Sequence, residues 1–199
     1  MASTHEGAAE LTVGSAPFRG AGHRAQAEAI TVLRNTGILP LQRNARIYVE
    51  GVDTRVVADY ATVVDAPEQA DVAILRIAAP FEPRNDYFLE QMTHQGSLEF
   101  TPNVIAHVAA VARAVPVVLD VFLDRPAILT PLEGATSGLV VNFGASDAAL
   151  LDALFGCIAP RGRLPFEIPR SMDAVRASRS DVAGDTEDAL YSFGFGLRL

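Results

Sequence analysis

The chain of 199 residues contains no lysine and a single cysteine, Cys157. Without lysine it can form no Schiff base with a substrate and no phosphate-binding loop of the Walker type. One cysteine excludes an internal disulfide and a zinc site built from cysteines. The histidines are also few and scattered, with no HxxxH pair among His5, His23, His94 and His107. We therefore expect neither a metal site nor a cofactor.

Positive charge is scarce as well, with 16 arginines against 24 acidic residues and a net charge of −8. A nucleic-acid-binding protein carries a basic stripe that contacts phosphates, and no such stripe occurs here. No apolar run approaches the roughly 20 residues of a membrane span. The first residues, MASTHEGAAELTV, lack the basic and apolar regions of a signal peptide. These absences predict a cytoplasmic protein that binds neither nucleic acid nor membrane.

The composition that remains, 49% hydrophobic and 20% charged, is ordinary for a folded protein. A chain of this length can bury a core of its own without disulfides or metals. Residues 1–21 are small, polar and glycine-rich, which predicts a loose leader or a severed linker. We expect residues 22–199 to form one domain.

Apolar runs and amphipathic stretches alternate along that domain. The first stretch, residues 22–35, predicts a helix that Gly37 would cap. Further helices are expected over 101–114 and 146–156, begun by the capping residues Thr101 and Ser146. Strands are expected over residues 46–50, 61–64, 71–78, 116–121 and 139–142. The alternation predicts an α/β fold, a three-layer α/β/α sandwich around a mostly parallel, doubly wound sheet of about five to six strands.

In such a sheet, ligands bind beyond the carboxyl ends of the strands. The segments expected there are residues 51–54, 79–100, 122–125 and 143–145. The second is by far the longest, and long loops inside compact domains are usually functional. Its polar side chains are Glu82, Arg84, Asp86, Glu90, His94 and Glu99.

Several of these residues allow both a functional and a structural interpretation. Glu82 lies between two prolines that restrict its backbone, and Arg84 either keeps this carboxylate ionised or forms an exposed pair of negligible energy. His94 either binds a polar ligand or is simply solvated or hydrogen-bonded to the backbone. Asp124 and Arg125 follow a strand and are either ligand-binding residues or a strand-end ion pair.

Motifs in the second half carry a family resemblance. The segments AVPVVLDVFLDRPAIL, NFGASDAALLDALFGCIAPRGRLPFEIP and YSFGFGL resemble the C-terminal α/β sandwich domain of family 3 glycoside hydrolases. Upstream, ITVLRNTGILPL and RIYVEGVD are similar to the same domain's first helix, first strand and following glycine. The resemblance covers roughly residues 22–199, and it implies the sandwich fold that the alternation predicts independently.

The resemblance also implies a site. In this family a barrel domain supplies a nucleophilic aspartate, and the sandwich often supplies the acid/base glutamate from the loop after its third strand. By resemblance that glutamate is Glu82, with Glu90 as the reserve candidate. HQGSLEF is similar to the same loop in a bacterial branch of β-glucosidases, so His94 is expected to line a sugar site. Arg84, Asp124 and Arg125 are the further substrate-binding candidates.

The sequence departs from the family because no barrel precedes the sandwich. Retaining hydrolysis needs a second carboxylate about 5–5.5 Å from the first. That group either lies on another polypeptide or is one of Glu50, Asp53 and Asp124, which could approach Glu82 across the strand ends.

Three hypotheses follow from this departure. The chain is the C-terminal domain or half of a β-glucosidase-like hydrolase, inactive alone and completing a sugar site with a barrel partner. Alternatively, it is a free-standing small-molecule enzyme that reuses residues 79–100. As a third possibility, it is a non-catalytic module that binds a sugar or protein, or associates with itself, through the face a barrel would cover.

Overall fold

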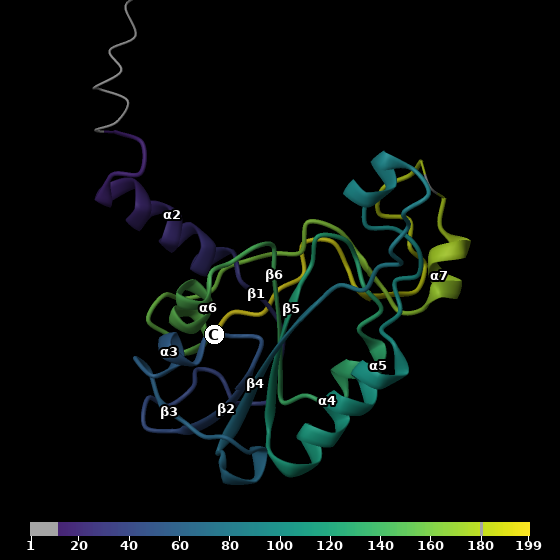
Figure 1. Cartoon of the computed structure of the whole chain (residues 1–199). Helices are drawn as coiled ribbons and strands as arrows, with labels where there is room; N and C mark the ends of the chain where they lie inside the picture. The colour runs from purple at the N-terminus through teal and green to yellow at the C-terminus, as the bar shows by residue number, and fades with distance from the viewer. Residues whose placement is uncertain (1–11, 180) are drawn as a thin grey trace, which may run out of the picture.

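The structure is a computed structural model that describes residues 12–179 and 181–199. Its centre is a six-stranded sheet with the order β1-β6-β5-β4-β2-β3, shown in Figure 1. All neighbouring strands are parallel except β1 and β6, which are antiparallel. The strands are β1 (Thr31–Asn35), β2 (Arg46–Glu50), β3 (Thr62–Val63), β4 (Val72–Ala78), β5 (Val117–Phe122) and β6 (Gly138–Asn142). The predicted mostly parallel, doubly wound sheet is confirmed.

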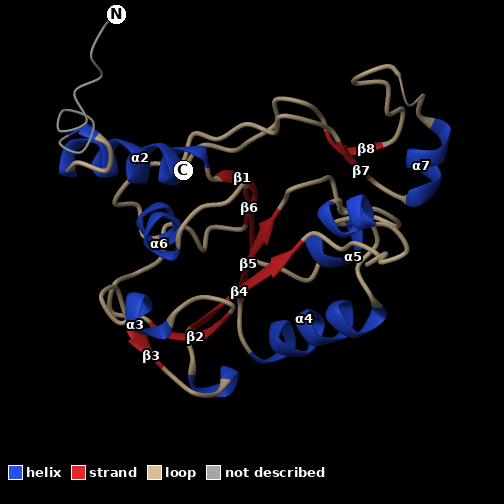
Figure 2. Cartoon of the chain, turned by 45° about the horizontal axis from the view of Figure 1, so that its top comes forward, coloured by secondary structure: helices blue, strands red, loops and turns tan. Residues whose placement is uncertain are grey.

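Helices cover both faces of this sheet, as Figure 2 shows. One face packs against α3 (Thr54–Val57) and α6 (Asp147–Leu154), and the other against α4 (Pro102–Ala114) and α5 (Thr130–Glu133). Helix α2 (Ala16–Ala29) packs against α6. The central strands β5 and β6 are almost wholly buried because apolar side chains on both of their faces meet a helical layer. The three-layer sandwich is therefore the way in which this chain buries two apolar sheet faces at once.

The prediction of one helix over residues 22–35 is wrong in its second half. The helix α2 begins at Ala16 and ends at Ala29, and residues 31–35 form strand β1, with Gly37 in the following turn. The β-branched residues Ile30, Thr31 and Val32 are buried, and the strand pairs with β6. Tertiary pairing thus overrides a periodicity that continues the helix. Of the expected leader, residues 1–11 lie outside the described part of the chain.

The last forty residues form a small second sheet and a tail that reaches β1, the edge strand of the large sheet. A small antiparallel pair, β7 (Ile168–Pro169) and β8 (Ala189–Tyr191), flanks helix α7 (Met172–Ala177). The tail then reaches β1, where the Leu197 amide donates to the Val32 carbonyl at 2.8 Å. Gly162 lies so close to β1 that a Cβ atom there would stand 2.2 Å from the Ala29 carbonyl oxygen. The glycine of the GRLP motif is thus a packing requirement.

The parallel strands all end at one edge of the sheet, called here the carboxyl edge. The chain moves from β2 outward to β3 and then back across β2 to β4, β5 and β6. The four segments predicted to carry ligand-binding residues follow β2, β4, β5 and β6, and therefore share this edge. No helix among the described residues has the length and apolar character needed to cross a membrane.

Candidate functional site

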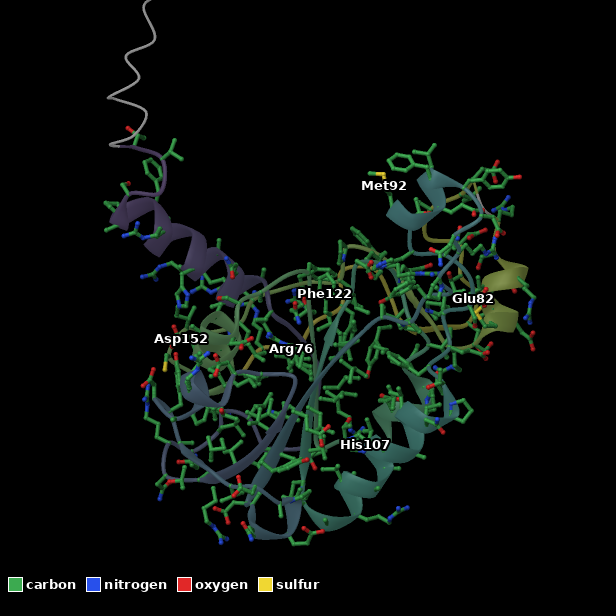
Figure 3. All side chains as sticks on the ribbon, in the orientation of Figure 1. Arg76, Glu82, Met92, His107, Phe122 and Asp152 are labelled. Carbon is green, nitrogen blue, oxygen red and sulfur yellow. The ribbon has the colours of Figure 1, made fainter. Side chains whose placement is uncertain are left out.

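The longest segment at the carboxyl edge, residues 79–100, leaves β4 and folds back on itself. The Glu82 amide donates to the Gln95 carbonyl at 2.8 Å, which brings the two arms of the loop together. Between the arms lies a short 3-10 helix, η2 (Phe88–Met92), which carries the labelled Met92 in Figure 3. The second arm is tied to the body of the domain where the Ile128 amide donates to the Leu98 carbonyl at 2.8 Å. The loop is thus a folded projection with defined contacts.

Glu82, the predicted acid/base residue, lies at the base of this projection. One carboxylate oxygen, Oε1, accepts a hydrogen bond from the Ser97 amide at 3.1 Å, while the other lies 3.7 Å from the Arg84 guanidinium. The Glu82 side chain is 55% exposed, so its pair with Arg84 contributes little energy. Gly96 leaves the space that the carboxylate fills, because a Cβ atom there would lie 2.3 Å from Glu82 Cδ. The backbone of residues 95–97, more than Arg84, therefore orients the carboxylate.

His94 is brought to Phe81 and Asp124. Its ring Nδ1 is hydrogen-bonded to Asp124 Oδ2, and the ring stacks on Phe81 with 3.9 Å between centroids and 9° between planes. In the described structure Asp124 and Arg125 bind the loop instead of each other: Arg125 Nη2 donates to the Gly96 carbonyl at 2.8 Å. The strand-end ion pair offered as one interpretation of Asp124 and Arg125 is therefore not formed.

Glu90, the reserve candidate, has a local structural contact. Its Oε2 accepts a hydrogen bond from the Tyr87 amide at 3.1 Å, which caps the amino end of η2. This bond satisfies a backbone donor that the short helix leaves free. The Glu90 carboxylate therefore stabilises the tip of the projection, whereas Glu82 stands at its base.

The other carboxylates considered as partners of Glu82 are engaged near the end of β2. Glu50 accepts hydrogen bonds from Tyr48 at 2.6 Å and from His107 Nε2 at 2.7 Å, and the first bond raises the pKa of Tyr48 to about 12. Asp53 caps α3 and binds Arg55, whose hydrogen bonds lower the pKa of Asp53. Both carboxylates are held by these neighbours rather than by contacts with Glu82.

A buried polar network lies beside the site, and sequence reasoning missed it. Arg76 Nε donates to Asp120 Oδ2 at 2.6 Å, and its Nη1 donates to Asp147 Oδ1. Asn142 Nδ2 donates to the second oxygen of Asp120 at 2.9 Å. Asp120 is completely buried, and this burial raises its pKa against the opposing charge of Arg76. The sequence signal for this network was the presence of three polar residues, Arg76, Asp120 and Asn142, in otherwise apolar strands.

The network also organises the turn after β6. The side-chain oxygen of Asn142 accepts hydrogen bonds from the Gly144 amide at 3.0 Å and the Ala145 amide at 3.1 Å. A shallow cavity of about 440 Å³ opens above it at the carboxyl edge, where Figure 3 labels Arg76 and Phe122. The network therefore holds the ends of β4, β5 and β6 and the turn after β6 in place at the carboxyl edge.

Exposed apolar side chains gather over the same edge. Four residues of the projection are 70–78% exposed: Tyr87, Phe88, Leu89 and Met92. Phe81, Phe143 and Phe193 add further exposed rings. Among the described residues, the loops at the amino ends of the parallel strands carry no large exposed apolar side chain. Exposed apolar side chains that gather in this way are typical of an interaction surface.

The described residues include no group of three or more histidine, cysteine or carboxylate side chains that could hold a metal ion. At the carboxyl edge the groups that could transfer a proton are carboxylates and the imidazole of His94. Glu82 is an accessible carboxylate at the base of the projection, and the Ser97 amide helps to set its orientation.

Comparison with known proteins gives this geometry a context. Residues 49–199 match the glycosyl hydrolase family 3 C-terminal domain. The chain is 40% identical over 195 residues to Beta-glucosidase C of Emericella nidulans, covering 96% of this chain and 31% of the relative. It is 38% identical over 190 residues to the periplasmic beta-glucosidase/beta-xylosidase of Dickeya chrysanthemi, covering 93% of this chain and 29% of that protein. The chain therefore spans about a third of these curated relatives.

Solved structures show the same fold at lower sequence identity. A β-glucosidase of Listeria innocua in complex with glucose superposes with a TM-score of 0.74 at 16% identity, over 94% of this chain and 34% of that one. The β-glucosidase EmGH1 of Erythrobacter marinus gives a TM-score of 0.76 at 19% identity, over 96% and 36%. In both cases the match is again about one third of the solved chain.

Proposed function

The chain belongs to the glycosyl hydrolase family 3 C-terminal domain family, and we propose that it completes the sugar site of a β-glucosidase-like hydrolase by supplying Glu82 as the acid/base. The nucleophilic carboxylate comes from a barrel domain that docks on the carboxyl edge. The observation that carries this proposal is the placement of Glu82, accessible at the edge yet oriented by the Ser97 amide.

The assignment matches what the reaction demands. In the first step a protonated carboxyl donates its proton to the glycosidic oxygen as the bond to the sugar breaks and the nucleophile forms a glycosyl ester. In the second step the same group, now a carboxylate, takes a proton from the water that hydrolyses the ester. Glu82 has room for both steps because only one of its oxygens accepts a backbone hydrogen bond.

The nucleophile is assigned to another domain for two reasons. Glu50 and Asp53 are engaged with His107 and Arg55 near β2, and Asp124 is engaged with His94. The relatives are about three times as long as this chain. A second domain therefore supplies the partner carboxylate in this proposal.

The surface chemistry supports docking on the carboxyl edge. The exposed apolar side chains of residues 81–92, Phe143 and Phe193 lie on this edge, and the start of α2 lies on the same side of the sheet in Figure 1. A domain that precedes α2 would reach the edge without crossing the molecule.

The experiment is a chimera in which this chain replaces the matching third of Beta-glucosidase C of Emericella nidulans. We expect the chimera to hydrolyse an aryl β-glucoside, while the remaining two thirds of the relative and this chain are each inactive alone. Glu82→Gln is expected to lower kcat by about 10²- to 10⁴-fold because general acid–base catalysis contributes that much. Glu90→Gln is the matched control from the same loop. A loss confined to Glu90→Gln would transfer the role to Glu90, and an unaffected Glu82→Gln chimera would refute the proposal.

A further inference from the structure

Two residues just beyond β5, Asp124 and Arg125, both contact the segment that carries Glu82. We propose that they are positioning residues, a clamp that fixes the acid/base carboxylate, instead of ligands of the sugar. The inference rests on the proposed role of Glu82 for its catalytic consequence. Its structural part, that the clamp orders the loop, stands on contacts within this chain.

The first arm of the clamp runs from Asp124 to the backbone next to Glu82. The carboxylate of Asp124 holds the ring of His94, and the ring stacks in parallel on Phe81 at 3.9 Å. Phe81 directly precedes Glu82 in the chain. An aromatic stack and a charge-assisted hydrogen bond thus connect the end of β5 to the residue before the acid/base.

The second arm runs from Arg125 to the opposite side of Glu82. Its Nη2 donates to the Gly96 carbonyl at 2.8 Å, and its Nη1 is buried without a hydrogen-bond partner among the described residues. Gly96 is the residue whose missing side chain makes room for the Glu82 carboxylate. A guanidinium that points inward and holds a backbone carbonyl is placed to order the loop and is poorly placed to meet a sugar from solvent.

The two arms matter because the loop is long while its attachment point is rigid. Residues 79–100 form a long loop after β4, whereas β5 is a buried central strand. Loops of this length retain much conformational freedom unless other contacts remove it. Catalysis is sensitive to such freedom, since a displacement of about 1 Å can reduce a rate by about 10²-fold. Two contacts from the end of β5 transfer the rigidity of the sheet to Glu82.

Hydrogen exchange on the chain itself tests the structural part. The reporters are the amide of Glu82, bonded to the Gln95 carbonyl, and the amide of Ser97, bonded to the Glu82 carboxylate. We expect Asp124→Ala and Arg125→Met each to speed exchange at both amides by about tenfold, the effect of losing one charge-assisted hydrogen bond. Unchanged exchange of the amides in β5 and β6 establishes that the variants are folded.

The chain offers a matched control at its other histidine–carboxylate pair. His107 and Glu50 are 54% and 33% exposed, close to the 42% and 30% of His94 and Asp124. This pair joins α4 to the end of β2. His107→Ala is expected to change exchange at Glu82 and Ser97 by less than about twofold. Equal exchange in Asp124→Ala, Arg125→Met and the unmodified chain would overturn the clamp.

Kinetics of the chimera separate positioning from sugar binding. Asp124→Ala is expected to lower kcat by about tenfold or more while KM changes by less than about twofold, because a mispositioned acid acts on the reaction step. Asp124→Asn, which keeps an oxygen acceptor for His94, is expected to recover most of the rate. A raised KM with unchanged kcat would identify Asp124 as a sugar ligand and refute the inference. If Glu82→Gln leaves activity intact, the proposed function fails, while the exchange experiment still decides the clamp.

Discussion

Gly96 offers the sharpest perturbation of the site because a Cβ atom there would meet the Glu82 side chain directly. A Cβ atom on Gly96 would lie 2.3 Å from Glu82 Cδ and 2.5 Å from both Cγ and Oε2. An ordinary contact begins near 3.4 Å, so the carboxyl group of Glu82 has to move by about 1 Å in Gly96→Ala. A displacement of about this size is expected to lower kcat of the chimera by about 10²-fold.

The backbone of Gly96 adds a separate cost, which a second glycine isolates. Gly96 has a φ of +84°, and an alanine in this region costs roughly 1–2 kcal/mol of unfolding free energy. Gly37 has a φ of +99° with no atom within 4 Å of the Cβ position. Gly37→Ala therefore carries the backbone strain without the steric conflict.

The assay combines urea unfolding of the chain with steady-state hydrolysis of an aryl β-glucoside by the chimera. Both variants are expected to lose a similar amount of unfolding free energy. Only Gly96→Ala is expected to lower kcat, by about 10²-fold, because only there does the Glu82 carboxyl group have to move. Full activity in a folded Gly96→Ala chimera would refute the argument that the backbone of residues 95–97 orients the Glu82 carboxylate. Equal loss in Gly37→Ala would assign the effect to strain.

Three further predictions concern stability and association. Arg76→Met leaves the buried Asp120 without its ion-pair partner and is expected to cost about 3–5 kcal/mol in urea unfolding at neutral pH, whereas a cost below about 1 kcal/mol would show that the network is not coupled to folding. Burial raises the pKa of Asp120 above its ordinary 3.8, so its contribution to stability is fully present below about 3.8 and is lost as pH rises through the folded-state pKa. The stability of the unmodified chain relative to Asp120→Asn is accordingly expected to fall over that interval, and a pH-independent difference would contradict it. With its apolar edge uncovered, the chain alone is expected to self-associate at high concentration, and Phe88→Ser with Leu89→Ser to weaken that association in sedimentation experiments. A monomer at all concentrations would argue against an uncovered docking surface.

Much of the fold follows from local sequence patterns. The apolar runs of β4, β5 and β6 predict buried parallel strands, and the pair Thr101–Pro102 marks the start of α4 where the structure has it. Strand β1 was mistaken for the end of a helix because its burial depends on pairing with β6, more than a hundred residues away. The hydrophobic periodicity of a short stretch of sequence carries no information on a strand that pairs with it from so far along the chain.

The site was predictable only in part, for a similar reason. Glu82 and His94 share one long loop, so the sequence places them together at the carboxyl edge. The contacts of His94 with Asp124 and of Glu82 with Ser97 depend on how the loop folds back. The buried network joins residues 76, 120, 142 and 147, which lie on three strands and one helix and are far apart in the sequence. Its members become a group only once the strands are in register.

The central claim, that Glu82 is the acid/base of a shared sugar site, is tested most directly by azide rescue of the Glu82→Gln chimera. Azide attacks the anomeric carbon of the glycosyl ester and needs no general base, while the ester carboxylate leaves. The account predicts that azide restores turnover of an aryl glucoside with a good leaving group and that β-glucosyl azide accumulates, with no such effect in Glu90→Gln. An impaired Glu82→Gln chimera that azide does not rescue, or rescue confined to Glu90→Gln, would contradict it.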